Sequence, residues 1–344
     1  MSDSCSIFFN TNFVRIKFGI SILGFILNLI NIFIFIKIIY KRNQTDNLFK
    51  YFLTKSLSDF YVNMFGVVMG LVDIYFTNQV QPFIQFCLFR LIFDEYMCFV
   101  FQSISMLCDV ASSLNRYKSI TNGFKFSNKI SIIIKILLMS SYSLIYYSFK
   151  LFQKYCAVTS PISTSLNNSN STSSSHKPLY KIDHYKHFKQ TPIDLGFSLT
   201  HTIIRDGICT MLIIIFNLLI LFQMRKLIKS KKSINPTNNT SSKNEKATQA
   251  QKNLNRMVLL TSTFTLICHL LLFIYYLPIQ ITANPCYKTI MLILFYLSLS
   301  INFFTYFKFN LHFKRLFLSY IIRLVPISKG FLIKNKIDFE KTLV

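Results

Sequence analysis

The sequence predicts an all-α protein in which seven helices cross a membrane and a short amphipathic helix follows the seventh. Three observations support this fold class. Of the 344 residues, 52% are hydrophobic and only 15% are charged, whereas soluble domains average about a quarter charged residues. The apolar residues gather in seven runs, each close to the roughly 20 residues that a helix needs to cross a bilayer. These runs are too long and too continuous to be strands of a membrane barrel.

The apolar runs divide the chain into three parts: an N-terminal segment of residues 1–17, a membrane domain of residues 18–307 and a basic tail of residues 308–344. The first run is too long for a signal peptide and lacks a small-residue cleavage site, so we expect no cleaved leader. The predicted spans lie near residues 18–40, 51–74, 92–115, 130–152, 200–224, 257–279 and 288–307.

Basic residues orient the bundle. The connecting segments 41–50, 116–129, 225–256 and 308–344 hold 24 Lys and Arg, whereas the alternate segments 1–17, 75–90, 153–199 and 280–288 hold 9. Because cytoplasmic loops are enriched in basic residues, this bias predicts an outer N-terminus and an inner C-terminus. The net charge of +25 could suit nucleic acid, but its placement between apolar runs indicates a lipid bilayer as the partner instead.

Polar residues inside the spans carry the functional signal, because an ionisable group in a membrane helix is costly to bury. Asp59 lies in the second span, and the triplet Asn115-Arg116-Tyr117 closes the third. The seventh span ends with Asn302-Phe-Phe-Thr-Tyr306, and a basic, aromatic stretch follows it. The first span contains Gly24 and Asn28.

In this order, these residues resemble the motifs of the rhodopsin-like (class A) G-protein-coupled receptor family. That family has an Asn in helix one, an acid in helix two, an acid-Arg-Tyr triplet ending helix three, and Asn-Pro-x-x-Tyr in helix seven. The chain also looks like divergent invertebrate receptors of the FMRFamide neuropeptide and chemosensory types. The resemblance implies a non-enzymatic plasma-membrane receptor that binds an extracellular ligand and activates a cytoplasmic heterotrimeric G protein.

The sequence departs from the family pattern at several points. Asn115 replaces the acid beside the Arg, and Phe303 replaces the Pro of helix seven. Helix six has Cys268-His269 where the family shows Cys-Trp, and the whole chain contains no Trp. These departures concern the switching mechanism more than the class of protein.

The resemblance assigns Asn115, Arg116 and Tyr117 to G-protein coupling, and Asn302 and Tyr306 to a switch in helix seven. An Arg that only reaches the lipid headgroups is the alternative for Arg116. The resemblance also implies an allosteric sodium ion as the one cofactor. Hard oxygen ligands suit such a cation, and they would come from Asp59, Ser105, Ser298 and Asn302.

A second interpretation of Asp59 stays open at this point, because Lys55 lies four residues before it and the two side chains can pair on one helix face. The Cys residues form no CxxC pair, and we expect no zinc or other metal centre. In the family, the positions of Cys87 and Cys156 are joined by a disulfide, although Cys87 is four residues further from Arg116 than usual. Cys5 and Cys286 form a weaker second candidate pair.

The ligand pocket is expected to open outward among helices three, five, six and seven. Cys98 stands where amine receptors keep an Asp, and Tyr296 stands where opsins keep a Lys, which disfavours both ligand classes. Acids near the rim suit a basic ligand such as an amidated peptide. His269 is either a rotamer switch or a satisfied buried polar group. The residues expected around the pocket are Asp94, Glu95, Gln102, Arg205, Asp206, His269, Tyr275, Tyr276 and Tyr296.

Two other classes of membrane protein compete with the receptor. A transporter or channel of seven helices would tend to show internal repeats and helices broken by Gly or Pro, and we find no repeat. A membrane-embedded enzyme would need acids or His residues at facing depths. The six His are dispersed, and only Asp59 and Asp109 lie deep within the predicted spans.

Glycosylation tests the predicted orientation. The predicted outer segment has acceptor triplets at Asn167 and Asn170, and the predicted inner one has them at Asn238 and Asn239. Because only the outer face receives N-linked sugars, Asn167→Gln with Asn170→Gln should abolish the mobility shift caused by glycosidase. A shift that survives these changes but disappears with Asn238→Gln and Asn239→Gln would reverse the orientation.

Overall fold

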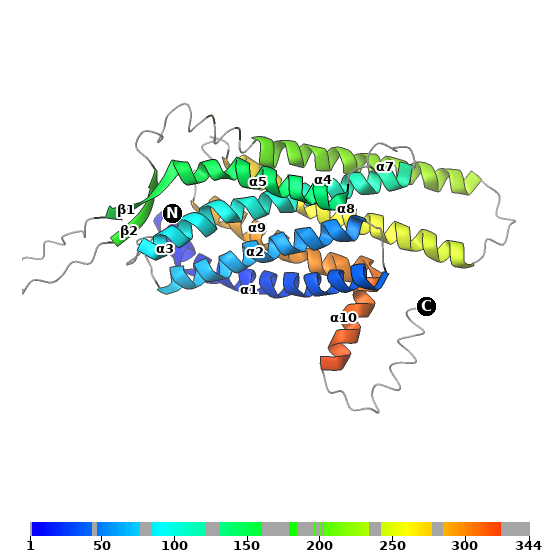
Figure 1. Ribbon diagram of the computed structural model, residues 1–344, viewed down its shortest axis with the longest axis horizontal. Helices are drawn as coiled ribbons and strands as arrows, with labels where there is room; N and C mark the ends of the chain where they lie inside the picture. The colour runs from blue at the N-terminus through cyan, green and yellow to red at the C-terminus, as the bar shows by residue number, and fades with distance from the viewer. Residues whose placement is uncertain are drawn as a thin grey trace, which may run out of the picture.

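A computed structural model describes residues 2–42, 47–75, 84–121, 131–159, 179–184, 196, 200, 203–233, 242–276 and 285–324. In this part of the chain, seven helices are long and apolar enough to cross a membrane, as the sequence predicts. They lie side by side in one bundle (Figure 1). The four acceptor asparagines and the Ser-rich run 163–175 lie outside the described residues.

The spans belong to seven helices: α1 (Ser2–Arg42), α2 (Asn47–Tyr75), α4 (Cys98–Thr121), α5 (Ile132–Gln153), α7 (Cys209–Ser233), α8 (Ser242–Tyr276) and α9 (Pro285–Phe309). The third span begins earlier, with α3 (Ile84–Phe89) and the π-helical turns η1 (Arg90–Met97), and η3 (Ile203–Ile208) precedes α7. Two further elements lie at opposite ends of the bundle (Figure 1): the hairpin of β1 (Lys154–Thr159) and β2 (Leu179–His184), and the helix α10 (Leu311–Leu324).

Some helices extend well beyond the apolar runs. The helix α8 begins at Ser242, although the apolar run begins near residue 257. Its first turns contain Lys, Glu, Ala and Gln, which favour helix without favouring lipid. Hydropathy therefore locates the part of a helix inside the membrane, but it does not locate the ends of the helix.

The hairpin in the outer segment was not predicted. Its strands pair antiparallel, with Lys154 opposite His184 and Thr159 opposite Leu179. Each strand has only six residues, too few for an alternating pattern to stand out beside seven long apolar runs.

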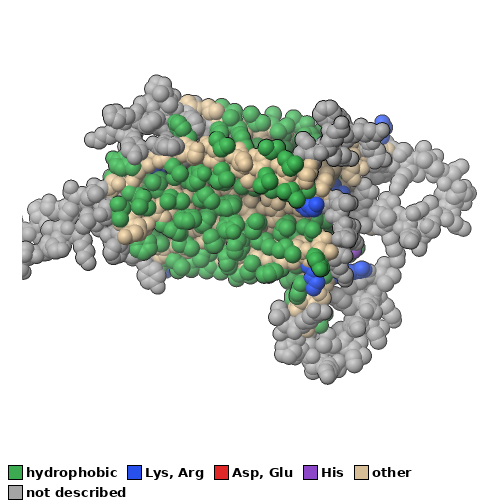
Figure 2. Space-filling view, in the orientation of Figure 1, with side chains coloured by type: hydrophobic (Ala, Val, Ile, Leu, Met, Phe, Trp, Pro, Cys, Tyr) green, Lys and Arg blue, Asp and Glu red, His purple; other side chains and the backbone are tan. Residues whose placement is uncertain are grey.

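The outward faces of the helices are apolar. Leu138, Ile145 and Phe222 keep 61%, 74% and 62% of their surface exposed within the molecule. Figure 2 shows hydrophobic side chains covering the visible face of the bundle between its two ends. Water would oppose so large an apolar surface, whereas a bilayer accommodates it. The chain is therefore a multi-pass membrane protein.

Small residues let α1 and α2 approach closely. A Cβ added to Gly24 would collide with the side chains of Asn63 on α2 and Ser300 on α9, and one added to Gly66 would lie 2.5 Å from Ser21 Oγ. Close backbone approach of this kind stabilises helix pairs in lipid, where apolar burial offers little driving force.

Polar side chains connect other helix pairs. Asn28 Nδ2 donates to the Leu299 carbonyl at 3.1 Å, joining α1 to α9. Asn217 Nδ2 donates to Ser262 Oγ at 2.8 Å, joining α7 to α8. Hydrogen bonds of this kind are each worth about 0.6 kcal/mol on average within a membrane bundle.

The helix α10 begins at an N-cap. The Asn310 side-chain oxygen accepts hydrogen bonds from the backbone N–H groups of His312 and Phe313, both at 3.1 Å. Such a cap satisfies N–H groups that the first helical turn leaves free. Phe303, which replaces the family's Pro, packs its ring 5.1 Å from the Phe317 ring, so the substitution adds an α9–α10 contact.

The glycine contacts predict a matched pair of variants. Gly24→Ala should lower the thermal unfolding midpoint in detergent or lipid, because the new Cβ has no room. Gly19→Ala on the same helix should leave it unchanged or slightly raised, since nothing lies within 4 Å of that position and Ala favours helix by about 1 kcal/mol over Gly. Equal midpoints for the two variants would contradict the α1–α2 packing.

Candidate functional site

A buried polar cluster occupies the middle of the bundle. Lys55 and Asp59 lie one turn apart on α2, and Ser105 and Asp109 lie one turn apart on α4. Asn302 on α9 completes the cluster. All five residues are between 0% and 4% exposed. Because no water in the bilayer core can solvate such groups, they must satisfy one another.

An ion pair connects α2 to α4 within this cluster. Lys55 Nζ lies 2.5 Å from Asp109 Oδ2 and also donates to Ser105 Oγ at 3.4 Å. Where the sequence left open a pairing of Lys55 with Asp59 on one helix face, the structure shows the direct ion pair of Lys55 with Asp109. In the described part of the chain, Lys55 is connected to Asp59 only through Ser105. The flexible lysine side chain reaches across to the facing helix, where Asp109 offers a direct contact.

Asp59 connects three helices. Its Oδ1 accepts the Ser105 hydroxyl hydrogen at 2.6 Å, and its Oδ2 accepts an Asn302 amide hydrogen at 3.1 Å. The structure thus brings together three of the four residues in the predicted sodium set. The fourth, Ser298, donates to the Phe295 carbonyl on its own helix at 2.7 Å.

The cluster does not fit the sodium ion that the resemblance implies. The oxygen atoms that such an ion would need already have partners: Ser105 Oγ accepts a hydrogen bond from the Lys55 ammonium. Both oxygens of Asp59 accept hydrogen bonds, one from Ser105 and one from Asn302. Among the described residues, no group of three or more His, Cys, Asp or Glu is placed to hold another metal ion.

From the sequence, Asp109 was identified only as a deep acid. Its spacing could have placed it among the functional residues, because Asp109 precedes Arg116 by seven residues, or about two helical turns, and therefore lies on the same buried face of α4. Nothing in the sequence marked Lys55 as its partner. Removing one member of a buried pair typically costs about 3–5 kcal/mol, because the other charge is left uncompensated.

The C-terminal end of α4 carries the triplet that the sequence analysis predicted to couple to a G protein. Arg116 is 5% exposed, and the Tyr117 ring lies 6.4 Å from the Phe216 ring on α7. Tyr306 on α9 is fully buried, with its ring 5.0 Å from that of Phe35 on α1. Its hydroxyl is among the buried atoms without a hydrogen-bond partner in the described part of the chain.

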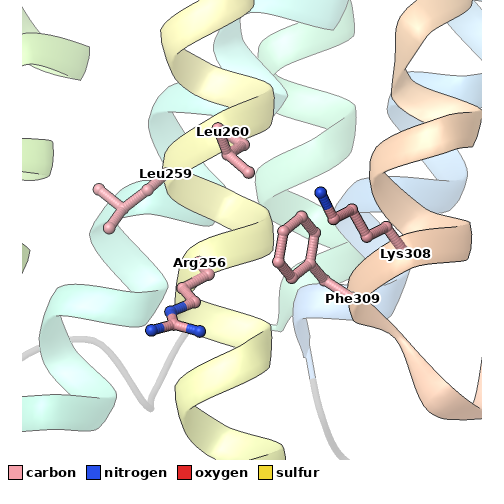
Figure 3. Close-up of a pocket in the computed structure, with 5 residues that line it drawn as sticks. All are labelled: Arg256, Leu259, Leu260, Lys308 and Phe309. Atoms are coloured by element: carbon pink, nitrogen blue, oxygen red, sulfur yellow. The ribbon is translucent and has the colours of Figure 1, made fainter.

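A shallow groove of about 480 Å³ lies near this end, between α8 and α9. Arg256, Leu259 and Leu260 line one side, and Lys308 and Phe309 line the other (Figure 3). The Lys308 ammonium lies 5.4 Å from the centre of the Phe309 ring, and Figure 3 shows the Arg256 side chain extending away from Lys308. The groove therefore combines apolar walls with two separated positive charges.

At the end of the bundle that carries the hairpin, two of the predicted ligand-binding acids, Asp94 and Glu95, are already paired. Arg90 Nε lies 3.9 Å from Asp94, and Lys154 Nζ lies 2.5 Å from Glu95. A basic ligand would therefore meet acids that already have basic partners. The Lys154–Glu95 pair was not foreseeable, because Lys154 comes from β1, an element that was not predicted. Arg90 and Asp94 are four residues apart, a spacing that can indicate a pair on one helix face.

Other predicted pocket residues lie deeper. Gln102 donates to Cys98 Sγ at 3.3 Å on the same helix, and Tyr296 is buried with its ring centre 5.3 Å from the Lys17 ammonium. His269 is buried and meets the Phe295 ring edge-on at 5.9 Å. The side chains of Arg205, Asp206, Tyr275 and Tyr276 lie outside the described part of the structure.

A disulfide joins Cys87 on α3 to Cys156 on β1, with Cα atoms 6.0 Å apart. The pairing implied by the resemblance is confirmed. The four additional residues between Cys87 and Arg116 amount to about one helical turn, and the helical segments α3 and η1 accommodate them. Cys98, Cys108, Cys209 and Cys268 are buried and lie outside this disulfide. The side chains of Cys5 and Cys286 lie outside the described residues.

The chain matches no protein-family model, and the comparison with curated proteins gives no match either. The arrangement of the buried polar residues is therefore the basis for assigning a function.

Proposed function

We propose that this multi-pass membrane protein is a rhodopsin-like G-protein-coupled receptor of the plasma membrane, with its N-terminus outside. The observation that carries the proposal is the contact of Asp59 with both Ser105 and Asn302. Asp59, Ser105 and Asn302 come from three motifs far apart in the sequence and meet at one depth in the bundle. Ser105 lies on the same helix as Arg116, about three turns before it. This arrangement supports a bundle whose polar centre couples its two ends.

The proposed mechanism is a change between two helix arrangements. Arg116 is almost fully buried in the arrangement described, so a partner can contact it only when neighbouring helices move apart. A ligand that binds one arrangement better shifts the population toward it, and movement of whole helices is a common form of such a change. The G protein would then contact Arg116 at the opened inner end.

The ligand is proposed to be extracellular, either a neuropeptide or a chemosensory cue. The expected pocket residues Gln102, His269 and Tyr296 combine polar groups with aromatic rings, a composition typical of sites for small organic groups. Because Asp94 and Glu95 already have basic partners, a positively charged ligand would have to displace Arg90 or Lys154 to reach them.

One alternative function has a specific observation in its favour. Buried Lys and Asp residues within a membrane also mark ion and proton pathways in transporters and channels, and Lys55, Asp59 and Asp109 are such residues. Purified protein in sealed vesicles would distinguish the two functions. A flux of ions or protons that depends on Asp109, without guanine-nucleotide exchange, would favour the transporter or channel.

Arg116→Ala should reduce ligand-independent nucleotide exchange by reconstituted heterotrimeric G proteins at least about ten-fold, the effect of losing roughly 1.4 kcal/mol of interaction. Arg225→Ala is the matched control, because Arg225 is an exposed arginine near the inner end of α7 and should have a small effect. Both variants are compared with the wild type at equal amounts of folded protein. Undiminished exchange by Arg116→Ala would contradict the coupling role.

Asn115 should leave the inactive state weakly held. In the family, the residue at this position is an acid that pairs with the neighbouring Arg. A charge-assisted hydrogen bond is roughly twice as strong as a neutral one, which is worth about 1 kcal/mol. Losing about 1 kcal/mol changes the ratio of two states about five-fold. The start of the sixth span offers no replacement, since it carries Arg256 rather than an acid.

We therefore expect measurable ligand-independent signalling, reduced several-fold by Asn115→Asp. The measurement is the basal second-messenger level at matched surface expression. Asn115→Gln serves as the control, because it keeps a neutral amide and should preserve the basal signal. An equal or higher signal from Asn115→Asp would mean that other contacts hold the inactive state.

A further inference from the structure

The central cluster holds two buried carboxylates and one buried ammonium. Lys55, Asp59 and Asp109 are 3%, 0% and 1% exposed. A buried carboxylate requires a nearby positive charge or hydrogen-bond donors, because burial removes its hydration. Lys55 is the basic side chain in direct contact with this cluster in the described part of the structure.

The position of the ammonium lets it serve both acids. Lys55 Nζ contacts Asp109 directly, and it contacts Ser105 Oγ, whose hydrogen is donated to Asp59. The ammonium therefore reaches Asp109 by a direct contact and Asp59 through a single hydroxyl group. An ammonium has three N–H donors, enough to bind several oxygen atoms in a compact site.

We propose that the Lys55 ammonium is the permanent counter-ion of Asp59 and Asp109, so that the chain's own cation serves this cluster and no sodium ion binds there. The proposal rests on the geometry of the cluster and not on the receptor function. Lys55 thereby determines the ion specificity of the site.

If no sodium ion binds in the cluster, the thermal stability of the protein should not depend on sodium. The full-length chain in lipid nanodiscs should have the same thermal unfolding midpoint in sodium chloride and in potassium chloride at equal ionic strength. Asp59→Asn should also show no difference between the two salts. A sodium-specific rise in the wild type that Asp59→Asn abolishes would overturn the proposal, because it would place a sodium ion beside Lys55.

Two variants test whether Lys55 is the residue that excludes the ion. Lys55→Gln removes the charge but keeps a hydrogen-bonding side chain. Lys55→Leu with Asp109→Leu removes both members of the pair, a change that membrane and soluble cores often tolerate better than the loss of one charge. Each retains Asp59, Ser105 and Asn302, so sodium should now raise the midpoint by about 2–4 °C when present at about ten times its dissociation constant.

Adding Asp59→Asn to either variant should remove the new response to sodium. If a folded variant shows no sodium-specific rise, Lys55 is not what keeps sodium out, and the proposal fails. If neither variant folds, the wild type and Asp59→Asn still decide the result through their response to the two salts. None of these measurements involves a G protein, so the outcome is separate from that of the receptor proposal.

Discussion

The ion pair between Lys55 on α2 and Asp109 on α4 is the interaction on which the centre of this bundle depends. Hydrocarbon offers no water to a buried charge, so each charged group must find its partners inside the protein. Lys55 contacts Asp109 and Ser105, Ser105 donates to Asp59, and Asn302 donates to the same carboxylate. One connected set of contacts therefore holds α2, α4 and α9 in register at mid-membrane depth.

This connected set also relates the middle of the bundle to its inner end. Asp109 and Arg116 lie two turns apart on one buried face of α4, so a rotation of that helix would displace both together. If the chain is the receptor proposed, the neutral Asn115 would give up about 1 kcal/mol of the restraint that an acid beside Arg116 would provide. The buried ion pair, whose disruption costs several times as much, is the stronger restraint on the position of α4. In the proposed receptor, the Lys55–Asp109 pair would hold the middle of α4 in place, while the helices around Arg116 could separate at a lower energetic cost.

At the end of the bundle that carries the hairpin, contacts between elements change what a residue is available to bind. From the sequence, Asp94 and Glu95 looked like open acids at the rim of a pocket. In the structure, Arg90 and Lys154 lie against them, and the Cys87–Cys156 disulfide attaches β1, which carries Lys154, to the start of the third span. The disulfide and the Lys154–Glu95 pair together fix the hairpin over this end. The recognition of a ligand there would depend on shape and aromatic contacts around Tyr296 more than on free negative charge.

The sequence by itself determined the seven spans, because membrane crossing depends on the length and polarity of each run alone. It also identified Asp59, Ser105 and Asn302 as a group and Cys87 with Cys156 as a pair, through motifs whose order along the chain resembles a known family. Only the tertiary structure decided the partner of Lys55, the pairing of Glu95 with Lys154, and the hairpin. Lys55 and Asp109 are 54 positions apart, and Lys55 had a candidate acid one turn away on its own helix. Which acid it contacts depends on how α2 is rotated against α4, and the packing of side chains between whole helices sets that rotation.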